Sequence, residues 1–181
     1  MRVFTMATRL GPLTIWESDK GLARLEYNNA SVERIKKFFG IEVEWSSDME
    51  SVRQVEAYLA GRLYEFDLPL DIDETGTEFQ RKAWRALLTI PYGELINYSE
   101  LALRMDCPTT IRAAGQANQR NPIALVVPCH RVIRTSGDLG GYIGGAQRKR
   151  ALLNIEKTHV NRYNDYKRNH AKSSGVIEDS V

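Results

Sequence analysis

A short acidic and turn-rich segment, residues 71–76, separates two parts of the chain that have different hydrophobic patterns. Before this segment, apolar runs alternate with turn signals such as Gly11-Pro12, which is typical of a small antiparallel sheet. After it, apolar residues recur at helical spacing. A chain of 181 residues is long enough for two small domains. We therefore predict an α+β fold, with a sheet-plus-helix domain over residues 1–72 and a mostly helical domain over residues 77–157.

The elements are predicted from turn residues, helix caps and apolar spacing. Thr77 and Gln80 have the form of a capping box, so we expect a helix to begin directly after the boundary. A last helix is predicted over Ala146–Glu156, followed by a polar and flexible tail over residues 158–181. The other predicted elements are strands over Arg2–Arg9, Leu13–Ser18 and Leu22–Tyr27, an extended piece over 64–70, and helices over 31–39 and 51–60.

The second domain contains the pattern of a helix-turn-helix. Ser99 is expected to cap a helix over Glu100–Met105, and a turn with Cys107-Pro108 leads to a second helix over Ile111–Arg120. Small residues give the second helix a low profile, and its other face carries side chains that can bind phosphates or base edges. These are Arg112, Gln116, Gln119 and Arg120.

The charge is divided between the two parts. Residues 77–157 hold twelve Lys and Arg against six Asp and Glu, whereas residues 1–76 hold nine against fourteen. A cationic domain suggests a polyanionic partner such as a nucleic acid, although a solvated basic face is the commoner explanation for charge alone.

Cys129 and His130 follow an apolar run, Ile123–Val127, and stand between Pro128 and Arg131. A thiol attacks only as the thiolate, and a free Cys with a pKa of about 8.5 is mostly protonated at neutral pH. A reactive Cys therefore needs a base or a positive field, which His130 and Arg131 can supply. A buried structural Cys beside a core His is the alternative that the pair alone leaves open. With two cysteines and no Cys-x-x-Cys pair, neither a disulfide framework nor a zinc site is expected.

An ordered set of motifs over residues 76–156 resembles the O6-alkylguanine-DNA alkyltransferase family, the methylated-DNA–protein-cysteine methyltransferases. Such a set is far more specific than any single motif. The resemblance implies a ribonuclease H-like first domain and a winged-helix-like second domain. The motifs are Gly76–Gln80 with Trp84, Ile90–Gly93, Tyr98–Ala102, Arg112–Gly115, Asn121-Pro122, Pro128–Ile133, Gly141-Tyr142, and Leu152-Leu153 with Glu156.

The resemblance also implies an activity. An alkyl group would pass irreversibly from O6 of guanine to Cys129 without a cofactor or a metal, and O4 of thymine is a second candidate. His130 would be the base, acting through a bridging water, Glu156 would orient it, and Asn121 would tie the recognition helix to the active-site turn. The implied partner is double-stranded DNA, bound at the minor groove with the damaged base flipped out. The implied DNA-binding and substrate-binding residues are Tyr98, Arg112, Ala113, Gly115, Gln116, Val132, Tyr142 and Ile143.

Two other functions are compatible with parts of this pattern. A non-reacting protein that only recognises alkylation lesions would have the same scaffold, but such relatives carry another residue at the position of Cys129. A thiol hydrolase would leave the helix-turn-helix unexplained. No apolar run approaches the roughly 18 residues of a membrane span. We expect a cytoplasmic monomer that associates with the nucleoid when it acts on DNA. Ile143 stands where some relatives have a hydroxyl residue, which leaves the breadth of the guanine pocket open.

Overall fold

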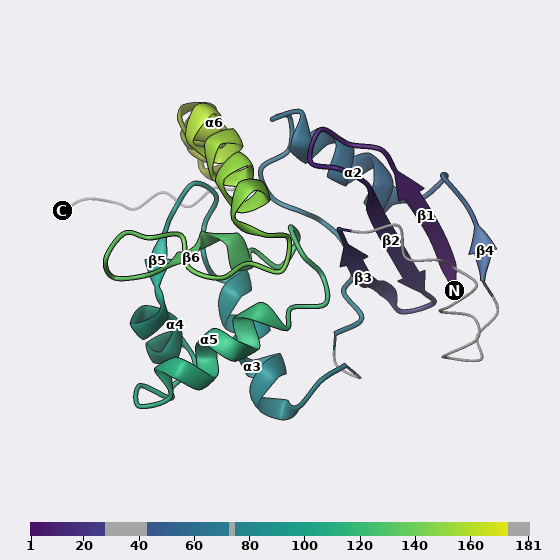
Figure 1. The fold of residues 1–181 in the computed structure, drawn as a ribbon. Helices are drawn as coiled ribbons and strands as arrows, with labels where there is room; N and C mark the ends of the chain where they lie inside the picture. Colours follow the sequence, from purple (N-terminus) through teal and green to yellow (C-terminus); the bar gives the residue numbers. More distant parts are fainter. Residues whose placement is uncertain (28–42, 73–74, 174–181) are drawn as a thin grey trace.

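The computed structural model describes residues 1–27, 43–72 and 75–173, and the helix predicted over 31–39 lies outside these ranges. Within the described residues, the first domain is a four-stranded sheet in the order β3-β2-β1-β4 with α2 packed on it (Figure 1). The pairs β1–β2 and β2–β3 are antiparallel, and β4 runs parallel to β1. The elements are β1 (Arg2–Met6), β2 (Leu13–Ser18), β3 (Gly21–Glu26), β4 (Glu44–Trp45) and α2 (Glu50–Leu59).

The three predicted strands are confirmed, but β1 is shorter than expected. It ends at Met6 rather than Arg9 because the chain turns at Thr8, whose hydroxyl donates to the Gly11 carbonyl oxygen at 2.6 Å. Gly11 has φ +90°, a conformation that glycine adopts readily. Helix α2 buries its apolar face as its spacing predicts, and Tyr58 is buried with it. The 64–70 segment forms no strand and makes one isolated bridge, from Leu70 to Leu22.

The second domain is built from four helices and two very short strands. The capping box at the start of α3 is confirmed, since the Thr77 hydroxyl accepts from the Gln80 amide and the Gln80 side chain accepts from the Thr77 amide. The elements are α3 (Glu78–Leu88), β5 (Ile96–Asn97), α4 (Tyr98–Arg104), α5 (Ile111–Gln119), the 3₁₀ turn η1 (Cys129–Arg131), β6 (Val132–Ile133) and α6 (Ala146–Ser173).

Helix α4 (Tyr98–Arg104) begins two residues earlier than the sequence predicts. Its N-cap is Asn97, whose side chain accepts from the amides of Ser99 and Glu100, so Ser99 is not the cap. The reason is tertiary: β5 pairs in parallel with β6, and this pairing holds Asn97 in the extended conformation that an N-cap needs. The same pair places the start of the helix-turn-helix directly beside the segment that follows η1.

The tail predicted from residue 158 is helical in the described part, and this expectation was wrong. Helix α6 continues to Ser173, and Tyr163, which is only 5% exposed, anchors it against the rings of Tyr64 and Tyr92. The Tyr163 hydroxyl also donates to Glu65 at 2.8 Å. The prediction rested on the polar composition of the segment. It did not take into account that one buried aromatic side chain, Tyr163, holds the helical turns beyond residue 158 against the rest of the protein.

The two domains share one continuous hydrophobic core, which runs from the sheet and α2 through α3 to α6. Backbone hydrogen bonds also join them, because the Leu25 amide donates to Pro122 at 3.0 Å and the Ala124 amide donates to Leu25 at 3.2 Å. Strand β3 therefore abuts the segment that leads to Cys129. Within the part of the chain that the structure describes, no helix is long and apolar enough to cross a membrane.

Candidate active site

The cysteine predicted to react is buried in the 3₁₀ turn η1. Cys129 is 1% exposed, and the Asn121 side-chain amide donates to its sulfur at 3.0 Å and to the Val127 carbonyl at 2.7 Å. The Asn121 side-chain oxygen accepts from the Ile123 amide at 3.0 Å. One buried amide therefore holds both ends of the segment between α5 and η1 and gives the sulfur a hydrogen-bond donor.

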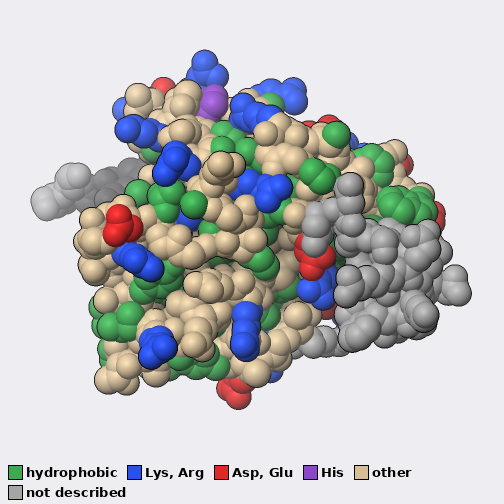
Figure 2. Space-filling view, viewed as in Figure 1, with side chains coloured by type: hydrophobic (Ala, Val, Ile, Leu, Met, Phe, Trp, Pro, Cys, Tyr) green, Lys and Arg blue, Asp and Glu red, His purple; other side chains and the backbone are tan. Residues whose placement is uncertain are grey.

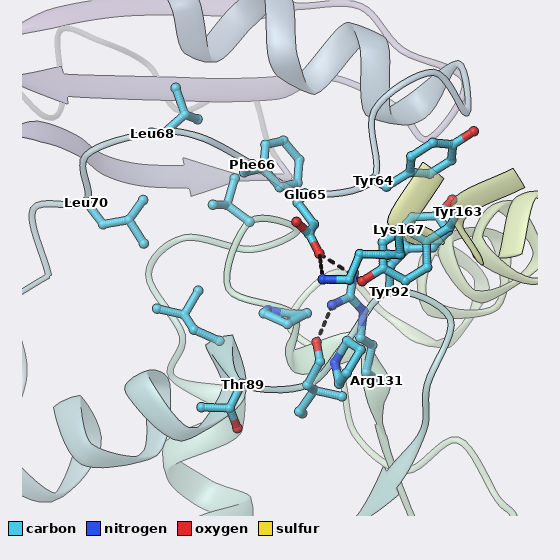
Figure 3. Close-up of a pocket in the computed structure, with 15 residues that line it drawn as sticks. Tyr64, Glu65, Phe66, Leu68, Leu70, Thr89, Tyr92, Arg131, Tyr163 and Lys167 are labelled. Atoms are coloured by element: carbon cyan, nitrogen blue, oxygen red, sulfur yellow. Dashed lines mark hydrogen bonds and ion pairs between the residues drawn. The ribbon is translucent and has the colours of Figure 1, made fainter. Parts of the chain in front are cut away.

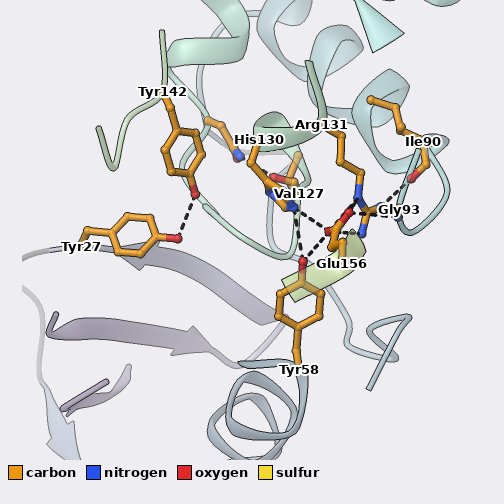
Figure 4. Close-up of polar contacts among 10 residues, drawn as sticks. Tyr27, Tyr58, Ile90, Gly93, Val127, His130, Arg131, Tyr142 and Glu156 are labelled. Carbon is orange, nitrogen blue, oxygen red and sulfur yellow. Dashed lines mark hydrogen bonds and ion pairs between the residues drawn. The ribbon is translucent and has the colours of Figure 1, made fainter. Parts of the chain in front are cut away.

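His130 and Glu156 meet as the resemblance implies. The His130 Nε2 atom lies 2.8 Å from the Glu156 Oε1 atom, and both side chains are almost completely buried (Figure 4). The other ring nitrogen, Nδ1, is buried and has no hydrogen-bond partner among the described residues. No direct hydrogen bond joins His130 to Cys129 within those residues. The geometry therefore leaves Nδ1 as the nitrogen that can accept a proton.

Arg131 does not supply the positive field that its position beside Cys129 suggests. Its guanidinium binds both carboxylate oxygens of Glu156, at 2.9 to 3.1 Å, and donates to the Ile90 carbonyl at 2.6 Å. The Gly93 amide adds a further donor to Glu156 at 3.0 Å. Glu156 thus neutralises the charge of Arg131. In return, the Arg131 guanidinium holds the Glu156 carboxylate in the position where it contacts His130.

Tyr58 completes this network from the other domain. It rises from α2, and its hydroxyl donates to Glu156 Oε1 at 2.5 Å and lies 3.3 Å from His130 Nε2 (Figure 4). The sequence analysis missed Tyr58, although it lies on the buried face of α2, one turn from Val55. A polar side chain on an apolar helix face was the available signal, but the pattern did not identify its partner.

Burial dominates the protonation states at this site. Burial raises the pKa of the Cys129 thiol to about 11, although the Asn121 hydrogen bond and the Lys149 charge oppose the shift. Burial also lowers the pKa of His130, against the pull of Glu156. For Glu156, burial would raise the pKa, but His130 and Arg131 hold it well below its ordinary value. At neutral pH the site therefore combines a protonated thiol, a neutral imidazole and an ionised carboxylate.

A buried lysine, Lys149, is the second residue that the sequence analysis missed. Its ammonium group donates to the carbonyls of Val132, at 2.5 Å, and Leu139. Burial lowers its pKa to about 8. Lys149 precedes Leu152 by three residues and Glu156 by seven, so helical spacing already placed it on the inward face of α6. It connects the segment after η1 to the loop before α6.

The residues predicted to bind DNA lie on and beside α5. Arg112, Ala113 and Gln116 are exposed, whereas Ala114 and Ala117 pack into the core, and the Ala117 carbonyl accepts from the Trp84 indole. Helix α5 crosses the near face in the view of Figure 1, and Figure 2 shows Lys and Arg side chains scattered over this half of the same face with few acidic ones between them. The exposed face of α5 is thus polar and lies in basic surroundings.

Tyr98 and Gly115 meet where α4 and α5 pack together. A Cβ atom added at Gly115 would lie 3.4 Å from the Tyr98 ring, an ordinary van der Waals distance, so this contact does not itself require a glycine. The Tyr98 hydroxyl reaches toward Gly140, where an added Cβ would lie 2.8 Å from it. Tyr98 therefore links the helix-turn-helix to the loop that carries Tyr142.

The predicted pocket residues Val132, Tyr142 and Ile143 differ in exposure. Tyr142 is buried, with its ring centroid 6.3 Å from that of His130, and Val132 is fully buried. Ile143 is 52% exposed, so its side chain points out and only its backbone can line a pocket. A separate cavity of about 340 Å³ lies between the 64–70 segment, the loop after α3 and helix α6 (Figure 3). Arg131 lines that cavity and Cys129 does not.

The second domain thus combines a helix-turn-helix, an element typical of DNA-binding proteins, with a buried thiol held by Asn121 and a neutral imidazole beside it. Two family models extend this statement. The DNA-binding domain of 6-O-methylguanine DNA methyltransferase matches residues 78–158, and the ribonuclease-like domain of the same family matches residues 1–72. The chain belongs to the 6-O-methylguanine DNA methyltransferase family.

Individual relatives support the same assignment. The methylated-DNA–protein-cysteine methyltransferase of Mycobacterium tuberculosis is 45% identical over 160 residues, which covers 86% of this chain and 92% of the relative. The protein of that name from Methanosarcina barkeri is 41% identical over 155 residues, with coverage of 83% and 94%. The crystal structure of Mycobacterium tuberculosis OGT in complex with DNA has a TM-score of 0.76 and 43% identity, covering 88% of this chain and 94% of that one.

Proposed function

We propose that this protein repairs alkylated DNA by direct reversal, taking the alkyl group from O6 of guanine onto Cys129 and remaining alkylated afterwards. The observation that carries the proposal is the buried Cys129 sulfur, held by the Asn121 amide in a turn that also carries the His130–Glu156 pair. Family membership supplies the reaction class, methyl transfer from DNA to a protein cysteine. A double-stranded DNA substrate would place the reaction in the cytoplasm, at the nucleoid.

The site chemistry accounts for a thiol that reacts only when substrate is present. Because the pKa of Cys129 is about 11, the thiol stays protonated at neutral pH and is protected from stray electrophiles. The thiol proton passes to His130 Nδ1 through a bridging water, and the ionised Glu156 stabilises the imidazolium that forms. The sulfur then attacks the alkyl carbon, an S–C bond forms, and the C–O6 bond breaks. The guanine, which stays in the DNA, takes up the proton that left the thiol. All atoms and charges are then accounted for without a cofactor.

The thioether product explains why each molecule would act once. Removal of the alkyl group would have to expel the Cys129 thiolate, which is a poor leaving group from an unactivated thioether at neutral pH. We therefore expect one alkyl group per chain and no turnover. The acceptor is consumed as the lesion is repaired.

The DNA enters through the exposed face of α5. We propose that α5 lies in the minor groove, where Ala113, Gly115 and Gln116 permit close approach, and that Arg112 fills the space of the flipped base. Tyr98 would rotate the nucleotide by contacting its 3′ phosphate. The guanine would be held beside Tyr142 and the backbone of Val132 and Ile143, and the protein would act as a monomer. O4-alkylthymine would be a second substrate.

Mass spectrometry of the protein after exposure to DNA containing O6-methylguanine tests residue and chemistry together. We expect the peptide that contains Cys129 to gain the mass of one methylene group, in a yield that stops at one per chain. Cys129→Ala should abolish the transfer and keep DNA binding, and Cys107→Ala is the matched control that should still react. Label on another residue, or many turnovers per molecule, would refute the proposal. An unreactive Cys129 in a protein that binds the lesion would instead favour the recognition protein.

A further inference from the structure

The first domain contacts the pocket loop through Tyr27, at the end of β3. The Tyr27 hydroxyl lies 2.9 Å from the Tyr142 hydroxyl, and the two rings meet edge to face with centroids 5.9 Å apart (Figure 4). Burial raises the pKa of both tyrosines, and the negative charge of a Cys129 thiolate would raise them further. Both hydroxyls therefore stay protonated, and one neutral hydrogen bond joins the two domains close to the acceptor sulfur.

Arg148 fixes the same loop from α6. Its guanidinium donates to the Gly144 carbonyl at 3.0 Å and to the Leu10 carbonyl at 2.6 Å, and it lies over the Tyr27 ring at 5.0 Å. The loop from Tyr142 to Gly145 is thus tied on one side to α6 and on the other to the β1–β2 turn. These contacts restrain the loop although it is rich in glycine.

There is little free space behind the loop. A Cβ atom added at Gly144 would lie 2.7 Å from ring atoms of both Tyr142 and Tyr27, closer than real Cβ contacts. Because the Tyr27 ring stands behind Tyr142 and Gly144, the loop cannot move away from Cys129 unless Tyr27 moves too. A larger alkyl group beside Cys129 needs more of this movement than a methyl group does.

We infer that Tyr27 sets the size of the alkyl group that the site accepts, by holding Tyr142 in place. The inference rests on the proposed function and deepens it, because it assigns a specificity role to a domain that contributes no reacting atom. Opening the pocket for a bulky group breaks the Tyr27–Tyr142 hydrogen bond, so that bond selects for small groups. Removal of this hydrogen bond should therefore speed the transfer of bulky groups and leave the transfer of a methyl group unchanged.

The test compares transfer rates from one oligonucleotide carrying either O6-methylguanine or O6-benzylguanine. Tyr27→Phe keeps the ring and removes the hydroxyl. We expect its methyl rate to stay within about twofold of wild type and its benzyl rate to rise about fivefold, the factor set by one neutral hydrogen bond. Tyr27→Ala, which also removes the ring, should increase the benzyl-to-methyl ratio at least as much. Tyr64→Phe removes a tyrosine hydroxyl that lies away from the loop and should leave the ratio unchanged.

The ratio separates specificity from a structural role, because a general loss of folding or DNA binding lowers both rates together. An unchanged ratio in Tyr27→Phe, or equal losses for both substrates, would overturn the inference while methyl transfer by the wild type still upheld the proposed function. A wild-type protein that accepted neither group would overturn the proposed function, and the inference with it.

Discussion

Replacement of Glu156 by glutamine should destabilise this protein more than almost any other single isosteric change. The carboxylate accepts from Tyr58, His130, Gly93 and the Arg131 guanidinium, and it is 1% exposed. A glutamine side chain has one acceptor oxygen, and an NH2 group replaces the other carboxylate oxygen. That NH2 group would face hydrogen-bond donors, which it cannot bind. The substitution also leaves the Arg131 charge buried without its partner.

The magnitude follows from that unpaired charge. Breaking a buried ion pair by removal of one partner costs about 3–5 kcal/mol. For a chain of this length, each kcal/mol lowers Tm by about 2–4 °C, so Glu156→Gln should melt roughly 6–20 °C below wild type. The pKa of Glu156 is lowered in the folded state, so its contribution is complete above its ordinary value of 4.5 and is lost as the pH falls. The difference between variant and wild type should therefore shrink in acid.

Thermal unfolding followed by circular dichroism at pH 7 and at pH 4 measures both effects. Glu65→Gln is the matched control, because that carboxylate is about half exposed and pairs with Lys167 at 3.3 Å at the surface. An exposed pair contributes about 0–1 kcal/mol, so the control should melt within about 4 °C of wild type. Equal melting temperatures for Glu156→Gln and Glu65→Gln would refute the view that Glu156 neutralises a buried Arg131.

Three further predictions concern other parts of the site. Lys149→Met should remove a rise in unfolding free energy between pH 8 and 10.5, because burial lowers the pKa of Lys149 to about 8 and the unfolded chain binds the extra proton in that range. Alkylation of Cys129 should lower stability by about 1–3 kcal/mol, because the added group overpacks a buried site, and denaturant titration measures it. Arg112→Ala should weaken DNA binding and reduce its salt dependence, measured by fluorescence anisotropy.

Each of these has a result that contradicts it. A pH-dependent stability of Lys149→Met that parallels wild type would show that Lys149 keeps its charge when buried. An unchanged denaturation midpoint after complete alkylation would mean that the space around Cys129 is loosely packed. Lys157→Ala removes an exposed basic side chain of α6 rather than α5 and is the control for Arg112→Ala. Equal losses from both variants would indicate nonspecific electrostatic attraction alone.

Much of the candidate site could be predicted from the sequence, because most of its residues belong to short motifs that can be recognised in the sequence. Asn121, Cys129 and His130 lie within ten residues of one another, and Glu156 was indicated by the resemblance. The network around them could not be predicted in the same way. Tyr58 reaches Glu156 across 98 positions of the chain, and no local pattern indicates which buried hydroxyl meets which carboxylate.

The elements that could be predicted from the sequence alone are those whose hydrogen bonds and apolar spacing are local. The capping box of Thr77 and Gln80 is an example, because its partners lie three residues apart. Tertiary structure decided the start of α4 at Asn97, the docking of Tyr163 beyond residue 158, and the contact between Tyr27 and the pocket loop. In each case the deciding free energy comes from burying a group against a distant segment, and that segment exists as a partner only once the chain has folded.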